Sequence, residues 1–395
     1  MEFYKDVLGD PKYIVAPMVD QSELAWRMLA RRYGAQLCYT PMLNSKVFVV
    51  NEHYRKTNFT TNEADRPLVV QFCGNEPNMM LEAALMVQDS CDAVDVNLGC
   101  PQNIAKKGHY GAFLQDEWQK VGEIVKVLSS NLKVPVSCKI RVFEDTEKTV
   151  EYAKMIEANG CKLLTVHGRL REQRGQLTGL ADWDKIKAVK KALKIPVVAN
   201  GNILYFEDIQ RCIDATGADG VMVAESQLNN PCLFDGMPHS VCRVASEFLQ
   251  ICIDHPDSCH PGAAKSHLFH MLHALLPIHT DLRERLGKPG LIYNDMLQIV
   301  TELSERIDES QETITVDDYG FKVIPVHLLQ PRIRDASRRH LSHSNESNQL
   351  VKFKKAKTSH CCRTCENMAS MKCSNLLCRH CCVSSGSLCE SHSSQ

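Results

Sequence analysis

The sequence contains no run of about 18 consecutive apolar residues, the length that a membrane-spanning helix requires. Its first ten residues, MEFYKDVLGD, are charged and lack the apolar segment of a secretory signal peptide. Net charge is also nearly absent, because 46 basic and 47 acidic residues leave a formal charge of -1. We therefore expect an intracellular protein, cytoplasmic or nuclear, that binds no membrane. The global charge does not identify a partner.

Cysteine, by contrast, is abundant, with 19 residues in the chain. Inside a cell the reducing environment favours free thiols and metal ligands over disulfides. A chain of 395 residues with 44% hydrophobic content can bury a large core. We expect one large domain with smaller appendages.

Short apolar runs alternate with segments of helical period between residues 13 and 226. Eight runs rich in Val and Ile can be distinguished: YIVAPMVD, QLCYTPML, PLVVQFCG, AVDVNLGCP, PVSCKIRVF, KLLTVHGRL, IPVVANGNI and GVMVAES. The segments between them carry apolar residues at i, i+3 and i+4. Eight βα units predict an α/β fold of the TIM-barrel type, although an open doubly wound sheet gives a similar alternation. We favour the barrel.

The domain boundaries follow changes in composition. We assign residues 1–240 to the (β/α)8 barrel and residues 241–325, with helical segments separated by Pro and Gly, to a small helical domain. Residues 326–358 are interpreted as a basic linker, because Lys and Arg outnumber acidic residues there. Residues 359–395 form a Cys-rich tail that is too short to build a core unaided.

Several polar residues follow the predicted strands at their C-terminal ends, where TIM barrels carry their chemistry. Lys139 lies in an apolar run and needs an anionic or strongly polar partner, a structural ion pair being the alternative. Asn200 and Gly201 end the seventh strand run, a common place for phosphate binding in barrels. An ordinary βα turn is the alternative interpretation of these two residues. His167 and Arg169 add two donors. Together these residues indicate an FMN site.

The most specific local motif is VDVNLGCPQNIAKKGHYGAFL, which follows the fourth predicted strand. It places Cys100 in a Gly-Cys-Pro turn, three residues after Asn97. A cysteine here could be buried and inert. Its position at the functional face of the barrel, outside the apolar part of the strand, instead favours a reactive thiol.

Six segments resemble the successive signatures of the tRNA-dihydrouridine synthases: APMVD, VVQFCG, VNLGCPQ, KIR, VHGR and VVANGNI. They occur in the family's order, and the resemblance continues through SHLFHMLHALLPIHTDLRERLG, so it covers residues 10 to 310. The tail is similar to that of the eukaryotic branch acting on D-loop positions sixteen and seventeen. The resemblance implies reduction of uridine to 5,6-dihydrouridine in tRNA by a monomer that uses FMN, with NADPH or NADH as reductant.

The resemblance also implies roles for individual residues. Hydride would reach C6 of the uracil ring, Cys100 would protonate C5, and Asn97 would hold the uracil edge. Arg141 and Arg169 would bind the substrate. The expected cofactor contacts are Pro17, Met18, Val19, Gln71, Lys139, His167, Asn200, Gly201, Asn202, Ala224 and Glu225.

One position departs from the family pattern, because Ser226 stands where glycine is expected in the final strand turn. A side chain there would hinder a close backbone approach to phosphate, unless the serine hydroxyl itself donates to the phosphate. The helical domain would add tRNA phosphate contacts, although an ordinary solvated helix face explains any one of them: His267, His270, His273, Arg283, Arg285 and Lys288.

The tail has the paired cysteine spacing of structural zinc sites. We expect up to two zinc ions, with ligands drawn from Cys362, Cys365, Cys373, Cys378, Cys381, Cys382, Cys389 and His392. A disordered, oxidisable tail is the alternative. Two other functions also stay open: a flavin barrel acting on a free small molecule, and a catalytically silent RNA-binding or scaffold protein.

Overall fold

The structure, a computed structural model, describes residues 2–175, 178–308, 310, 313–318 and 320–333. All of these residues belong to one compact unit. The Cys-rich tail and most of the predicted basic linker lie outside the described residues. No described helix combines the length and the apolar character that crossing a bilayer demands.

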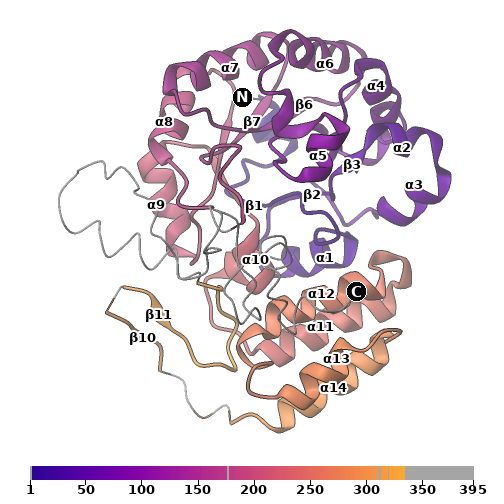
Figure 1. The fold of residues 1–395 in the computed structure, drawn as a ribbon, viewed down its shortest axis with the longest axis vertical. Helices are drawn as coiled ribbons and strands as arrows, with labels where there is room; N and C mark the ends of the chain where they lie inside the picture. Colours follow the sequence, from indigo (N-terminus) through magenta and orange to yellow (C-terminus); the bar gives the residue numbers. More distant parts are fainter. Residues whose placement is uncertain (1, 176–177, 309, 311–312, 319, 334–395) are drawn as a thin grey trace, which may run out of the picture. The chain divides into compact units, whose positions relative to one another are not determined.

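Eight parallel strands close into a barrel in the described part of the chain, which confirms the predicted TIM-barrel fold (Figure 1). The ring runs β1, β2, β4, β5, β6, β7, β8, β9 and back to β1. A two-residue strand, β3, pairs with the end of β4. The strands are β1 (Tyr13–Val15), β2 (Leu37–Tyr39), β3 (Leu43–Asn44), β4 (Leu68–Cys73), β5 (Ala93–Leu98), β6 (Val136–Arg141), β7 (Leu163–His167), β8 (Val197–Asn200) and β9 (Gly220–Val223).

Helices connect the strands in the predicted βα order. Two of them begin at aspartate N-caps: Asp145 accepts from the N–H of Lys148, and Asp182 accepts from that of Lys185. The helices of this part are α1 (Leu24–Arg32), α2 (Ser45–Val50), α3 (Glu52–Asn58), α4 (Pro77–Leu85), α5 (Asn103–Gly108), α6 (Trp118–Asn131), α7 (Thr146–Ala158), α8 (Trp183–Ala192), α9 (Glu207–Thr216) and α10 (Glu225–Asn229).

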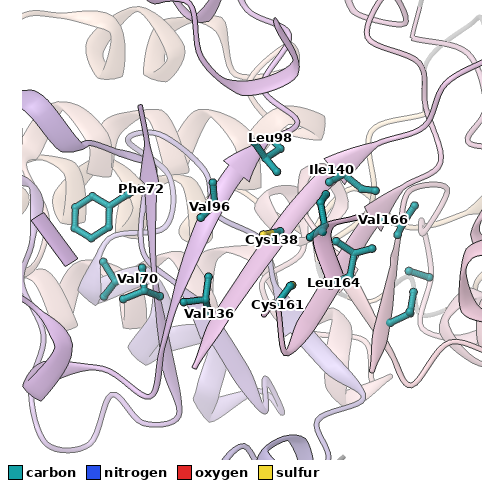
Figure 2. Packing of buried hydrophobic residues seen from close by; sticks show 14 of the residues in the cluster. Val70, Phe72, Val96, Leu98, Val136, Cys138, Ile140, Cys161, Leu164 and Val166 are labelled. Carbon is teal, nitrogen blue, oxygen red and sulfur yellow. The ribbon is translucent and has the colours of Figure 1, made fainter. Parts of the chain in front are cut away.

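Alternation along the strands separates two sets of side chains. One set, which includes Val70, Phe72, Val96, Cys138 and Val166, belongs to the large core that the strands share with the surrounding helices (Figure 2). The other set points into the barrel, and its deepest members form a second apolar cluster: Ile14, Leu37, Val69, Ala93, Leu163, Val198 and Met222. On four of these strands the next inward position is polar, so polar groups gather toward the C-terminal mouth: Gln71, Asp95, Thr165 and Asn200.

Four further helices pack beside α1 and α10 (Figure 1). They are α11 (Val241–Asp254), α12 (Pro261–Met271), α13 (Thr280–Gly287) and α14 (Tyr293–Glu305), followed by a short hairpin of β10 (Thr315–Val316) and β11 (Lys322–Val323). Trp26 of α1 stacks on the His267 ring of α12, with centroids 3.9 Å apart. Leu329, at the start of the predicted linker, is buried against the same core. The barrel and these helices therefore share continuous packing.

Candidate active site

The C-terminal ends of five consecutive barrel strands bring together most of the residues predicted for the site. Strand register places Asn97 beside Lys139, Arg141 beside His167, and His167 beside Asn200. The loop after β1 adds the three predicted residues Pro17, Met18 and Val19, of which Val19 is exposed. The predicted positions thus meet at one mouth, as the barrel topology requires.

Lys139 is held by an amide. Its Nζ donates to Asn200 Oδ1 at 3.0 Å, while Asn200 Nδ2 donates to the carbonyl of Met222 at 2.8 Å. Within the described residues Lys139 forms no ion pair, so the alternative of a structural ion pair is not what the structure contains. Burial, with the neighbouring Arg141 cation, lowers the pKa of Lys139 to about 8. The ammonium is therefore a partly buried cation that forms no ion pair within the described residues.

His167 is neutral, and its tautomer follows from its partner. Arg169 Nη1 lies 3.0 Å from His167 Nε2. A guanidinium can only donate, so Nε2 is the acceptor and the ring proton is assigned to Nδ1. Burial, followed by Lys139, Arg141 and Arg169, lowers the pKa of His167 well below its usual value. One neutral imidazole among three cations makes this side of the mouth electropositive, which suits an anionic ligand group.

The turn after β8 is tightly constrained. Gly201 has a φ of +114°, and a Cβ there would lie 2.7 Å from Ala181 Cβ, so only glycine fits. Asn202 Oδ1 accepts from Ala181 N–H at 2.8 Å and from Arg169 Nη2 at 3.3 Å, which fixes the turn. The turn follows the seventh strand of the barrel, where TIM barrels commonly bind phosphate.

Ser226 uses its hydroxyl within the protein. The buried side chain donates to the carbonyl of Ile203, which ties the start of α10 to the turn after β8. The alternative in which this hydroxyl donates to phosphate is therefore not the arrangement observed. The Ala224 and Glu225 positions lie at the beginning of α10, across from Gly201 and Asn202.

Residues 99–101, which we term the Cys100 turn, are anchored by Asn97 through two backbone N–H groups. Asn97 Oδ1 accepts from the N–H of Gly99 at 3.2 Å and from that of Cys100 at 2.9 Å. The Cys100 side chain remains partly exposed, unlike the ten other described cysteines. The turn therefore presents this thiol at the barrel mouth.

The carbonyl groups of the Cys100 turn are engaged as well. In order along the chain they accept from Arg141 Nε (2.9 Å), Ala112 N–H (3.1 Å) and Arg174 Nη1 (2.7 Å). Arg141 also donates to two carbonyls of the loop after β7 and is 8% exposed. Its predicted role as a substrate contact stays a prediction, because the observed bonds are internal. Both sides of the turn are thus fixed by hydrogen bonds.

A buried carboxylate stands behind Asn97, and the sequence analysis missed it. Asn97 Nδ2 donates to Gln71 Oε1 at 2.8 Å, and Gln71 Nε2 donates to Asp95 Oδ2 at 2.8 Å. Ser137 Oγ donates to the other carboxylate oxygen at 2.7 Å. Burial raises the pKa of Asp95 to about 6. An acidic residue in the otherwise apolar run AVDVNLG is the signal that could have drawn attention to it.

The predicted phosphate contacts of the helical segment do not all face outward. His267 is fully buried and bonds to Glu23 Oε1 at 2.7 Å, so its prediction as a phosphate contact is wrong. Arg285 is paired with Glu302, whereas Arg283 and Lys288 are exposed. Two further lysines of α5, Lys106 and Lys107, are exposed six and seven residues after Cys100. These were not among the predicted contacts.

Among the described residues, no group of three or more His, Cys, Asp or Glu side chains is arranged to hold a metal ion. The predicted zinc ligands, Cys362 to His392, lie outside the described residues, so the zinc site stays a prediction.

Comparison with known proteins gives a consistent result. The family model described as Dihydrouridine synthase (Dus) matches residues 14–307. A mouse protein named tRNA-dihydrouridine(16/17) synthase [NAD(P)(+)]-like is 54% identical over 73% of this chain and 60% of its own length. The Saccharomyces cerevisiae tRNA-dihydrouridine(16/17) synthase [NAD(P)(+)] is 46% identical over 83% of this chain and 85% of its own length. Among solved structures, morphinone reductase gives a TM-score of 0.42 at 13% identity, over 57% of this chain and 84% of that chain.

Proposed function

Because this chain belongs to the dihydrouridine synthase family, we propose that it reduces uridine to 5,6-dihydrouridine in the D-loop of tRNA, at positions sixteen and seventeen. The chain spans only 60% of the length of the mouse relative, so the whole activity is inferred from the site and from the relatives together. The observation that carries the proposal is a half-exposed cysteine on a rigid turn, directly beside an electropositive barrel mouth.

The residues at the mouth fit FMN. Lys139 supplies a partly buried cation without an ion-pair partner among the described residues, suited to the polar edge of the ring system. The glycine turn after β8 is suited to its phosphate, and Arg169 lies next to that turn. The other predicted contacts, from the loop after β1 and the start of α10, surround the same opening. When bound, the flavin would supply the hydride for C6 of the uracil ring, with NADPH or NADH as the source of reducing equivalents.

Cys100 would then deliver a proton to C5 as a general acid. A general acid must be protonated when it acts and must point in a defined direction. The hydrogen bonds on both sides of the Cys100 turn provide that direction. Lys139 and Arg141 lie within electrostatic range of Cys100, where they would stabilise the thiolate that remains after proton transfer.

The RNA would approach over exposed cations around the mouth. Lys106 and Lys107 follow the Cys100 turn, and Arg174 reaches the same turn from the loop after β7. A uridine must leave its stack before its C5 and C6 atoms can enter a barrel mouth, and phosphate contacts on either side would hold the flanking nucleotides.

Outside the described residues, we propose that the basic linker contacts tRNA and that the tail binds structural zinc. Metal analysis of the full-length protein, compared with a chain ending at Pro331, tests the zinc. Zinc in the full chain and none in the truncated chain supports the assignment, and a full chain without zinc contradicts it when purified under reducing, chelator-free conditions.

The decisive experiment for the activity measures both the flavin absorbance spectrum of the purified protein and the dihydrouridine that it forms in tRNA. The purified chain should carry a flavin band, and denaturation should release FMN. With NADPH or NADH and unmodified tRNA, it should form dihydrouridine at D-loop positions. Release of no flavin or of FAD would contradict the cofactor assignment, and a flavin-loaded protein that leaves tRNA unchanged would contradict the substrate.

A further inference from the structure

We propose that Asp95 is a positioning residue for the reaction, acting through Gln71 and Asn97 on the direction of Cys100. The inference rests on the proposed function of Cys100 as the proton donor. It starts from a chain of four hydrogen bonds that runs between the adjacent strands β4 and β5 from a buried carboxylate to the backbone of the Cys100 turn.

The polarity of this chain is set at its buried end. A carboxylate can only accept, so Asp95 Oδ2 requires the NH₂ group of Gln71. That requirement turns Gln71 Oε1 toward Asn97, which must then present its own NH₂ group. Asn97 Oδ1 is left facing the two N–H groups of Gly99 and Cys100. Amide side chains can exchange their O and N ends, whereas the Asp95 carboxylate can only accept. The backbone N–H groups at the other end can only donate, so both ends favour the same orientation of the two amides.

Asp95 is buried where it cannot contact solvent. Asp95, Gln71 and Ser137 are each completely buried, and register pairs Gln71 with Asp95 and Asp95 with Ser137 across neighbouring strands. An ionised carboxylate at such a place is unfavourable for the fold alone, since near-isosteric apolar residues would avoid its desolvation. Its presence in an apolar strand that leads into the Cys100 turn is explained if orientation of the turn is what it contributes.

The test compares Asp95→Val with Asp95→Asn in the holoenzyme. Valine removes the acceptor at similar volume, whereas asparagine can still accept from Gln71 and donate to Ser137. We expect Asp95→Val to slow oxidation of the reduced enzyme by tRNA about 10-fold to 100-fold, the effect of a misplacement of about 1 Å. Flavin content, reduction by NADPH and affinity for tRNA should remain unchanged. Asp95→Asn should restore the rate to within about threefold of the original.

A double-mutant cycle separates positioning from general damage to the barrel. In an Asn97→Ala background the chain is already broken, so Asp95→Val should cause no further loss of the same rate. Thr165→Val, which alters another buried polar side chain inside the barrel, serves as the control and should leave the rate unchanged. An undiminished rate in Asp95→Val, or losses that multiply independently with Asn97→Ala, would overturn the inference.

A second readout does not depend on catalysis. Iodoacetamide modification of Cys100, followed by peptide mass spectrometry, should proceed severalfold faster in Asp95→Val than in Asp95→Asn, because the turn is no longer held. If the unaltered protein fails to reduce tRNA, the proposed function fails, and this comparison still decides whether Asp95 controls the turn. Equal modification rates in the two variants would show that it does not. Asp95→Ala replaces Asp95→Val in both assays if the valine variant does not fold.

Discussion

Lys139 Nζ donates a 3.0 Å hydrogen bond to Asn200 Oδ1, so the residue proposed for the polar edge of the flavin is joined directly to the turn proposed for its phosphate. The bond crosses from β6 to β8, past β7. One cation thus organises both ends of the proposed cofactor site, which makes it the first position to alter.

Replacement of Lys139 with Met should leave the barrel folded, because a partly buried cation is removed and an apolar chain of similar length takes its place. We expect turnover to fall by about 100-fold to 1,000-fold, as when one preorganised electrostatic group is lost. Flavin absorbance per chain and single-turnover oxidation by tRNA are the measurements. Lys133→Met, at a lysine whose side chain is 72% exposed, is the matched control. Equal rates for the two variants would contradict the role of Lys139.

Asp95 provides a pH prediction for stability. Its pKa is raised by burial from 3.8 to about 6, so the folded state binds more protons than the unfolded state between these values. The free energy of unfolding should therefore fall as pH rises through this window. Asp95→Asn cannot titrate and should gain stability relative to the original at about pH 8, by about 2 to 3 kcal/mol.

The gain should shrink as pH falls from about 6 and approach zero below about pH 3, where Asp95 is protonated in both the folded and the unfolded state. Urea unfolding of the two proteins at several pH values gives the difference directly, and other carboxylates cancel because both proteins contain them. A difference that is independent of pH would mean that Asp95 does not titrate in this window.

The barrel and its chemical face could be predicted from sequence because both depend on local patterns. Apolar runs separated by helical periods predicted the eight strands, and polar residues at the ends of runs placed Asn97, His167 and Asn200 at one mouth. Lys139 is identifiable as a charge within an apolar run, and Gln71 through the family resemblance. Period-two alternation determines which side chains point inward, and a closed barrel then brings those side chains together.

What could not be predicted depends on partners distant in sequence. His267 lies in a helix with a basic outer pattern, yet it is buried because Trp26 and Glu23, more than 240 residues earlier, stack on it and bond to it. Asp95 looked like an ordinary strand residue because its partner Gln71 lies on another strand. Burial of a polar group becomes visible only when the residues that satisfy it are known.

The helical segment offers a contrast between a buried and an exposed basic residue. His267→Ala should destabilise the protein by about 2 to 4 kcal/mol, since it removes the ring stacked on Trp26 and leaves the partly buried Glu23 carboxylate without its partner. Arg283→Ala, at an exposed position, should change stability by no more than about 0.5 kcal/mol.

The effects of these two substitutions on tRNA affinity should have the opposite order when both variants are measured under conditions in which they are folded. Arg283→Ala should weaken binding and reduce the slope of log affinity against log salt by about one, as loss of a single phosphate contact does. Thermal unfolding and filter binding at several salt concentrations measure both quantities. If the Arg283 variant has unchanged affinity and salt slope, Arg283 of α13 does not contact a tRNA phosphate.

Cys100 is the position at which the proposed chemistry is tested most directly. Replacement with Ala should leave flavin bound and reducible by NADPH, because neither step uses the thiol and the Cys100 turn is held through its backbone rather than its side chain. Oxidation of the reduced enzyme by tRNA should slow by about 100-fold to 10,000-fold, the contribution of a positioned general acid, with little change in tRNA affinity. Cys73→Ala, at a buried cysteine at the end of β4, controls for loss of a thiol near the same mouth and should retain the rate. If Cys100→Ala reduced uridine at an undiminished rate, or lost flavin and fold together, the proton would have to come from another group.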